Sequence, residues 1–295
     1  MTIAVFGNLY RAQAVLQLNI ILDFLLEHQV EILLDGEWYE NLKNGGFKNI
    51  EKIGRVPDRL QEADMALSIG GDGTFLSTAA RIGSTGIPIL GVNAGRLGFL
   101  ADVPGDEIIR ALNAVIHGNY RIEKRTLLEI NASDGTAFDY PYALNEISVS
   151  KQDTSSMISV TASVNGDKIN TYQADGLIIS TPTGSTAYSM SVGGPLVVPQ
   201  AENFIISPVA SHSMTVRPLI IPDSWVIDLE VISRTRSFLV SLDGRSKVLE
   251  QGTKLKISRA GFVINVVKQP DQTFFDTLKN KLMWGADRRI DDLSL

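Results

Sequence analysis

In the first third of the chain, short apolar runs alternate with longer segments in which apolar residues recur every three or four positions. Short runs of this kind predict buried strands, here at residues 3–6, 31–34, 65–69 and 88–92. The longer segments predict helices at residues 12–28 and 74–82. Strands that alternate with helices are typical of a parallel sheet. We therefore expect an open α/β domain that binds ligands beyond the carboxyl ends of its strands.

From about residue 120 the pattern changes to short segments of alternating apolar and β-branched residues. Asp-Gly and Asn-Gly pairs, which favour tight hairpin turns, separate several of these segments, at residues 134–135, 165–166 and 243–244. Seven strands are expected, at residues 127–132, 143–150, 159–164, 176–180, 226–232, 238–242 and 254–258. Because few helical patterns lie among them, this part of the chain predicts an all-β sandwich.

The end of the chain returns to a helical pattern. Residues 274–284, after Pro270, predict an amphipathic helix, and residues 287–292 predict a loose tail. The expected division is an α/β domain at residues 1–110 and a β-sandwich at residues 111–270. The C-terminal helix, residues 273–285, could pack back on the first domain.

The composition is that of a globular protein with room for two cores. The chain has 295 residues, of which 44% are hydrophobic and 20% are charged. Its net charge of −6 argues against nucleic-acid binding, which normally needs a basic surface. The absence of cysteine excludes disulfides, thiolate metal sites and a cysteine nucleophile, and it fits a reducing cytosol.

The first residues predict neither export nor a membrane anchor. Residues 1–6 run into a turn without a cationic leader, so a signal peptide is not expected. The longest apolar segment, residues 14–26, is interrupted by polar residues and is shorter than the ~20 residues of a membrane span. We expect a cytoplasmic protein without nucleic-acid or membrane partners.

The sharpest local signal is Ser-Ile-Gly-Gly-Asp-Gly-Thr at residues 68–74, where a predicted strand runs into a turn that opens a helix. Glycines allow unusual φ angles and a close approach of ligand to backbone, and N–H groups at a helix start attract anions. Asp72 could accept a proton from an attacking hydroxyl or help to hold a metal ion. The alternative is a turn in which Asp72 only caps the helix that begins at Thr74.

Two further segments carry polar or aromatic residues at informative places. Residues 93–100 place Phe99 after a glycine-flanked turn, and the alternative is that this ring is simply core. Asn145 and Glu146 interrupt an apolar strand pattern, and strand alternation puts them on opposite faces. The alternative for this pair is a kink at a strand end with two exposed side chains.

The longest signal is residues 175–191, Asp-Gly-Leu-Ile-Ile-Ser-Thr-Pro-Thr-Gly-Ser-Thr-Ala-Tyr-Ser-Met-Ser, followed by Gly193-Gly194-Pro195. Its small residues allow a ligand to approach the main chain, its hydroxyls supply donors and acceptors, and the ring of Tyr188 can lie against a base. As composition alone, the run could also be a surface loop.

Together these four segments resemble the NAD kinase family, over most of the chain and in the family's order. The Gly-Gly-Asp-Gly-Thr turn is also similar to that of diacylglycerol and sphingosine kinases and, in variant form, of phosphofructokinases. The string at residues 175–191 is typical of NAD kinases. The resemblance implies a nucleotide-binding-like α/β domain, a β-sandwich, and an NAD site in the cleft between them. It also implies transfer of phosphate from ATP, another nucleoside triphosphate or polyphosphate to the 2′-hydroxyl of the adenosine ribose, which gives NADP.

The resemblance further implies roles for individual residues. Asp72 would be the base that activates the ribose hydroxyl, next to Gly73 and Phe99. Asn145 and Glu146 would hold the adenosine half of NAD. The residues expected on the nicotinamide half or around the dinucleotide are Asp175, Thr186, Ala187, Tyr188, Ser189, Met190 and Ser191.

The family resemblance implies a homo-oligomer, dimer or tetramer, in which a neighbouring subunit can complete the NAD pocket. It also implies a divalent cation such as Mg²⁺. Since the sequence has no metal-binding motif, the cation is expected to arrive with ATP rather than to have ligands of its own in the protein.

Three positions depart from the family pattern. Gln173 stands where many bacterial members place a basic residue, and Arg245 follows Asp243-Gly244 where relatives often have Gln. Ser156 aligns with a position at which some relatives have a His or Arg that makes a contact, and we assign no role to Ser156. These departures leave the phosphoryl donor and the choice between NAD and NADH open. Two rival functions also remain, a lipid or sugar kinase of the same superfamily and a non-catalytic NAD(P) sensor.

Overall fold

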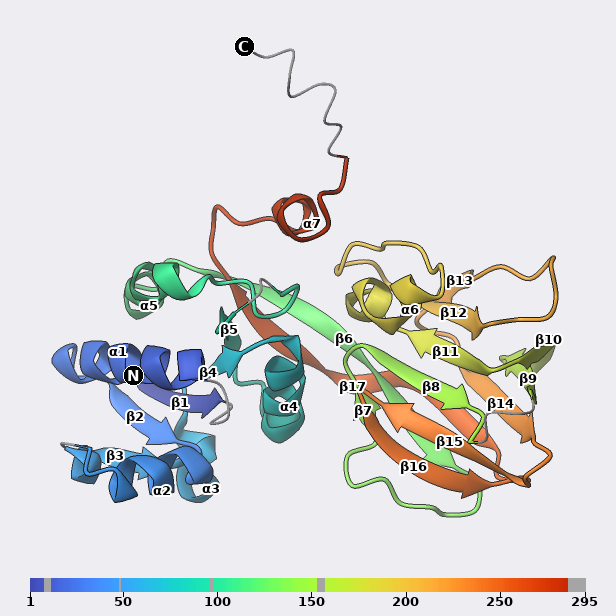
Figure 1. Cartoon of the computed structure of the whole chain (residues 1–295), viewed down its shortest axis with the longest axis horizontal. Helices are drawn as coiled ribbons and strands as arrows, with labels where there is room; N and C mark the ends of the chain where they lie inside the picture. Colours follow the sequence, from blue (N-terminus) through green and yellow to red (C-terminus); the bar gives the residue numbers. More distant parts are fainter. Residues whose placement is uncertain (8–11, 48, 96–97, 153–156, 286–295) are drawn as a thin grey trace, which may run out of the picture. The chain divides into compact units, whose positions relative to one another are not determined.

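The structure is a computed structural model of the chain (Figure 1). It describes residues 1–7, 12–47, 49–95, 98–152 and 157–285, so the tail predicted at residues 287–292 lies outside the described residues. The chain divides into two compact units. The first is Met1–Glu123 together with Asn265–Leu295, and the second is Lys124–Ile264.

The first unit is built on a parallel sheet with strand order β3-β2-β1-β4-β5, which the end of β17 joins beside β5. The strands are β1 (Thr2–Gly7), β2 (Glu31–Leu34), β3 (Ile53–Arg55), β4 (Met65–Gly70), β5 (Ile89–Asn93) and β17 (Leu255–Lys268). All four predicted strands of this region are present. The open α/β prediction is confirmed.

Helices cover both faces of this sheet (Figure 1). Helices α1 (Ala12–Glu27) and α5 (Ile108–Ile116) share a core with inward residues of β1 and β4, among them Val5 and Leu67. On the other face lies α4 (Asp72–Ile82), where the Thr78 hydroxyl donates to the Ser68 hydroxyl at 3.0 Å. The remaining α-helices described in this unit are α2 (Gly36–Asn44), α3 (Val56–Arg59) and α7 (Phe274–Leu282).

The second unit is a β-sandwich, as predicted. One layer contains β10, β9, β14 and β17 with β6 and β7 attached, and the other has the order β13-β12-β11-β8-β15-β16. Alternate residues of both layers, such as Val149 of β8 and Val160 of β9, meet in one core. The short α6 (Tyr188–Ser191) completes the unit.

The strands of the sandwich have the following bounds: β6 (Arg121–Ala132), β7 (Tyr142–Ala143), β8 (Glu146–Ser150), β9 (Ile158–Val164), β10 (Asp167–Ala174), β11 (Gly176–Ser180), β12 (Asn203–Val209), β13 (Leu219–Pro222), β14 (Ile227–Ile232), β15 (Ser237–Leu242) and β16 (Arg245–Glu250). Two of the predicted tight turns join β9 to β10 and β15 to β16. In both, the Asn-Gly or Asp-Gly pair has positive φ at each residue, as such hairpins require.

Candidate functional site

Asp72 is the first residue of α4, and its carboxylate binds a different loop. Oδ1 accepts hydrogen bonds from the backbone N–H groups of Leu100 at 2.9 Å and Ala101 at 3.1 Å, and Oδ2 accepts from that of Phe99 at 3.0 Å. Lys281 of α7 donates to Oδ2 at 3.2 Å. The N-cap of α4 is Gly71, without a side-chain cap bond. The alternative in which Asp72 only caps its helix is therefore wrong.

The surroundings of Asp72 keep it ionised. Burial acts to raise its pKa, but the N–H group of Leu100, the charge of Lys281 and the N–H groups of Phe99 and Ala101 outweigh burial. The pKa of Asp72 is thereby held below its usual value. At neutral pH the side chain is an anionic hydrogen-bond acceptor, which suits a role in orienting a hydroxyl.

The glycines around Asp72 provide space rather than unusual backbone angles. Gly70, Gly71 and Gly73 are all outside the left-handed region, so the expectation that they adopt unusual φ angles is wrong. A Cβ at Gly70 would lie 2.2 Å from Thr74 Oγ1, and a Cβ at Gly98 would lie 2.0 Å from Asp72 Oδ1. A Cβ at Gly73 would meet nothing within 4 Å. A side chain at Gly73 would therefore enter open space, whereas a side chain at Gly98 would collide with Asp72.

The loop that grips Asp72 is itself fixed to the sheet. The Asn93 side-chain amide donates to the Ala101 carbonyl at 3.3 Å, and the Val103 N–H donates to the Gly91 carbonyl at 3.2 Å. Next to Ala101, the buried Asp102 forms an ion pair with the buried Lys268 of β17. The geometry around Asp72 therefore rests on the core of the first unit. Arg96 and Leu97, which belong to this predicted segment, lie outside the described residues.

Phe99 is half-buried and packs against the C-terminal helix rather than in the main core. Its ring centroid is 6.2 Å from that of Phe274, and Lys281 Nζ is 4.5 Å from the ring centroid. The alternative that made Phe99 an ordinary core residue is wrong. Its partly accessible ring stays a predicted contact for NAD.

In the second unit, a buried carboxylate plays the same structural part for a second chain segment. Asp243 accepts hydrogen bonds from the N–H groups of Leu144 at 2.7 Å, Asn145 at 2.9 Å and Glu146 at 3.1 Å. From the other side, the Thr181 N–H donates to the Asn145 carbonyl at 2.9 Å. The backbone of the Asn145-Glu146 pair is therefore held on both sides, and none of these bonds uses the side chain of either residue. The pair is not a loose kink at a strand end.

Asp243 was not predicted as a site residue, because an Asp-Gly pair between two strands indicates a hairpin turn and nothing more. Burial raises its pKa, although the three N–H groups and the nearby Arg245 act in the opposite direction. The signal that could have identified Asp243 is the Asp-Gly pair that family members also carry in the later part of the chain.

Glu146 has a strongly perturbed carboxyl group. Burial, helped by the charge of Asp243, raises its pKa to about 7, against the lowering effect of the Tyr188 N–H. Among the described residues, its Oε2 atom is buried without a hydrogen-bond partner. Near neutral pH this side chain can both donate and accept a hydrogen bond, which matches a sugar hydroxyl.

The string at residues 175–191 is not a surface loop throughout. It runs from β11 through residues 181–185, which are buried, into α6. Thr186, Ala187 and Met190 are half-buried, Ser191 is exposed, and Tyr188 is 43% exposed with its N–H bound to Glu146. Ser189 is fully buried, and its hydroxyl lies 3.3 Å from that of Ser207. The structure thus brings Tyr188 and Glu146 together and turns Ser189 inward.

Asp175 lies apart from that group, beside a pocket of about 450 Å³. It forms an ion pair with Lys151 at 2.7 Å, and Gln173 lines the same pocket while accepting a hydrogen bond from Ser159 at 2.9 Å. Arg245 donates to the carbonyls of Tyr140 and Tyr142 at 3.0 and 2.6 Å, so it anchors a loop. Ser156 lies outside the described residues.

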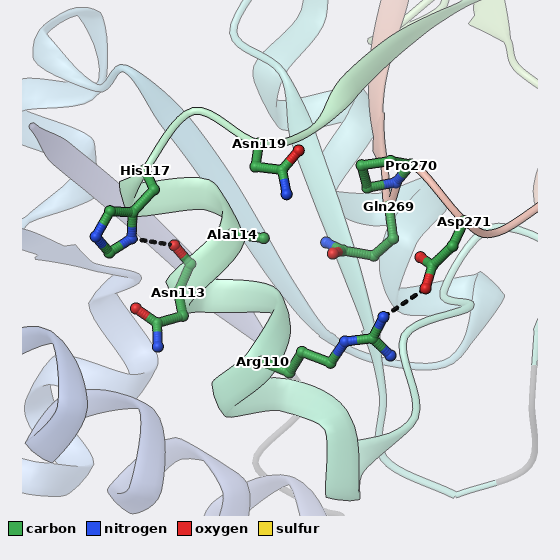
Figure 2. Close-up of a pocket in the computed structure, with 8 residues that line it drawn as sticks. All are labelled: Arg110, Asn113, Ala114, His117, Asn119, Gln269, Pro270 and Asp271. Atoms are coloured by element: carbon green, nitrogen blue, oxygen red, sulfur yellow. Dashed lines mark hydrogen bonds and ion pairs between the residues drawn. The ribbon is translucent and has the colours of Figure 1, made fainter.

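A pocket of about 590 Å³ lies away from these residues, between α5 and the chain after β17 (Figure 2). Figure 2 shows the Arg110–Asp271 ion pair at its edge. None of the predicted site residues lines it.

Within the part of the chain that the structure describes, three or more His, Asp or Glu side chains nowhere gather closely enough to hold a metal ion. Among the described residues, there is also no helix that is both long and apolar enough to cross a membrane.

The structure combines an α/β unit that carries an ionised aspartate after a Gly-Gly turn with a β-sandwich unit that contains an Asn-Glu pair, which is the two-domain arrangement expected from the resemblance to kinases with the Gly-Gly-Asp-Gly-Thr turn. Comparison with family models gives the particular family. Residues 3–120 match the ATP-NAD kinase N-terminal domain, and residues 144–268 match the ATP-NAD kinase C-terminal domain. The chain belongs to the NAD kinase family.

Individual relatives agree over nearly the full length. The chain is 48% identical to an NAD kinase of Bacteroides fragilis over 98% of this chain and 100% of that protein. It is 42% identical to an NAD kinase of Flavobacterium psychrophilum, again over 98% and 100%.

Solved structures share the fold. A yeast NADH kinase complexed with NADH has a TM-score of 0.89 at 23% identity, covering 98% of this chain and 89% of that chain. An NAD kinase from Archaeoglobus fulgidus in complex with ATP has a TM-score of 0.76 at 25% identity, covering 96% of this chain and 99% of that chain.

Proposed function

We propose that this enzyme transfers the terminal phosphoryl group of ATP to the 2′-hydroxyl of the adenosine ribose of NAD, giving NADP. Family membership supports the reaction. One observation carries the assignment of the centre: the Asp72 carboxylate is ionised and is fixed by three backbone N–H groups, and a Cβ on the next residue, Gly73, would meet nothing within 4 Å.

The role proposed for Asp72 follows from the demands of phosphoryl transfer. This reaction needs positioning and charge neutralisation more than covalent chemistry. Asp72 accepts the hydrogen bond of the ribose hydroxyl, aims its oxygen at the terminal phosphorus and takes its proton as the new bond forms. A carboxylate with a lowered pKa suits this task because the proton leaves late, when the attacking oxygen has become acidic.

The sandwich is proposed to hold the dinucleotide. Glu146, with a pKa of about 7, exchanges hydrogen bonds with a ribose hydroxyl, and Asn145 binds near the adenine. The exposed ring of Tyr188 stacks on a base, next to Thr186, Ala187, Met190, Ser191 and the main chain of Ser189. Asp175 is proposed to reach the nicotinamide half from the pocket that it shares with Lys151.

The phosphoryl donor is proposed to lie against the first turns of α4. A pocket of about 400 Å³ there is lined by the hydroxyl residues Thr74 and Ser77 and by Arg81, whose guanidinium forms an ion pair with Asp35 in the same pocket. N–H groups at a helix start favour phosphate. A divalent cation such as Mg²⁺, carried by the phosphate oxygens, would neutralise the charge of the triphosphate. Other nucleoside triphosphates and polyphosphate would present the same terminal group.

We also propose a cytoplasmic homo-oligomer, a dimer or tetramer. Strand β13 lies at the edge of its sheet and carries the half-exposed Ile220, a feature that association would cover. Light scattering of the purified protein tests this proposal, and a monomer at micromolar concentration would refute it.

The experiment that tests the function is a donor-by-acceptor matrix with the purified protein. ATP, another nucleoside triphosphate and polyphosphate are each combined with NAD, NADH, a diacylglycerol and a sugar, in the presence of magnesium. NADP should form from NAD and ATP, and it should form far more slowly with Asp72→Asn. Transfer to the lipid or sugar alone would favour the rival kinase, and tight NAD binding without any transfer would favour the sensor.

A further inference from the structure

The hydrogen-bonding capacity of Asp72 is completely used. A carboxylate offers about four acceptor positions, two on each oxygen. Oδ1 receives Leu100 and Ala101, and Oδ2 receives Phe99 and Lys281, so four donors occupy them. A ribose hydroxyl can bind Asp72 well only when one of these donors leaves.

Of the four donors, Lys281 is the one that can leave at little cost. The other three are backbone N–H groups of a loop that the core of the unit fixes. Lys281 is a long side chain on α7, and both it and the Asp72 side chain are 30% exposed. An ammonium group in that position remains partly hydrated and can rotate away through its four side-chain torsions.

The displaced ammonium would stay near the reacting atoms. Lys281 Nζ lies 4.5 Å from the centroid of the Phe99 ring, whose face attracts cations. Phe99 in turn is held by Phe274 at the start of the same helix. Because Nζ already lies over this ring while it is bonded to Asp72, the ring can keep the charge beside the carboxylate after that bond breaks. In the proposed reaction the transferred phosphoryl group has to approach the ribose oxygen at the same carboxylate.

We propose that Lys281 fills the acceptor position on Asp72 that the ribose hydroxyl needs, yields it when NAD binds, and then pairs with the phosphoryl group in transfer. This inference rests on the proposed function and adds a residue that the motifs do not contain. In the step, the ribose oxygen forms a bond to the terminal phosphorus while the bond from that phosphorus to the diphosphate leaving group breaks. The hydroxyl proton passes to Asp72, and nothing is oxidised or reduced.

The test compares three variants of α7 in the full-length protein. Lys281→Met removes the charge but keeps the length of the side chain, and Lys281→Arg keeps the charge. Lys279→Met is the matched control, since Lys279 is exposed on the same helix and its charge acts on Asp276. Thermal unfolding of each variant establishes that it is folded.

Lys281→Met should lower kcat about 10²-fold, as loss of one donor to a transition-state charge typically does. NAD affinity, measured by calorimetry, should stay equal or rise, because a competing donor is gone. The acid limb of the kcat/KM profile should move to higher pH, because Lys281 is the charged side chain that lowers the pKa of Asp72 among the described residues. Lys281→Arg should recover most of kcat, and Lys279→Met should match the wild type.

A Lys281→Met variant with the kcat of the wild type and an unshifted acid limb would overturn the inference. A loss of kcat in Lys279→Met as large as that in Lys281→Met would also overturn it. A rise in kcat would also overturn it, because Lys281 would then only block Asp72. These outcomes are separate from failure of the proposed function, in which the wild-type protein itself would form no NADP.

Discussion

Replacing Gly98 by alanine tests whether the loop after β5 shapes the catalytic centre. The added methyl group would lie 2.0 Å from Asp72 Oδ1 and 2.8 Å from its Cγ, whereas Cβ contacts under 3.0 Å are essentially absent from real structures. The carboxylate or the loop must therefore shift by roughly 1 Å, the difference between 3.0 and 2.0 Å. A misplacement of this size at a reacting group costs on the order of 10²-fold in rate.

The same substitution should lower the free energy of unfolding by about 1–3 kcal/mol, the usual cost of overpacking a filled site. The assay is NADP formation at saturating NAD and ATP, paired with urea unfolding. Gly261→Ala is the control, because a Cβ at Gly261 would meet nothing within 4 Å and the backbone there has no positive φ. A Gly98→Ala enzyme with a kcat within about threefold of the control would refute this account of the loop.

Three further predictions concern the rest of the site. The Gly73→Ala variant should be at least as stable as the wild type, because alanine favours a helix over glycine by about 1 kcal/mol. The same variant should bind NAD at least tenfold more weakly. An unchanged NAD affinity in calorimetry would show that NAD does not use the space at Gly73. The pKa of Glu146 is about 7 in the folded protein and about 4.5 when the side chain is unperturbed. Its ionisation therefore destabilises the folded state as the pH rises from about 4.5 to 7, by at most about 3 kcal/mol. Glu146→Gln should therefore gain stability over the wild type in urea unfolding at pH 8 but not at pH 4, and bind NAD more weakly; equal gains at both pH values would contradict this pKa. Asp243→Asn should lower the free energy of unfolding by about 1–3 kcal/mol, because an amide has one acceptor oxygen for three N–H groups. An unchanged urea midpoint would contradict the role of Asp243 in holding the backbone of residues 144–146.

The sequence predicted the elements whose pattern is strong. The buried strands β1, β2, β4 and β5 are continuous apolar runs, and α1 has a clear helical repeat. Strands β10 and β16 were missed because they lie at sheet edges, where β16 exposes most of its residues and β10 exposes half of its residues, which weakens the alternation. Strand β12 was missed although it is buried, and its Pro208 argues against a strand in sequence alone.

Composition and resemblance predicted which residues belong to the candidate site, but they did not predict which residues contact them. Asp72 and Glu146 stand in recognisable motifs, so their importance could be predicted. The partners that tune them, Lys281 for Asp72 and Asp243 for Glu146, are 209 and 97 residues away along the chain. Contacts of such long range depend on the tertiary fold, and neither partner stands in a pattern that indicates chemistry.

The claim on which the account depends is that Asp72 acts on the acceptor hydroxyl in the transition state. The measurement is kcat and, by calorimetry, the dissociation constant of NAD for the wild type and Asp72→Asn, a change that keeps the size of the side chain. We predict a loss of about 10²–10⁴ in kcat with a change in affinity of less than about threefold. Equal losses in kcat and affinity, or an Asp72→Asn enzyme that still forms NADP at close to the wild-type rate, would contradict the claim.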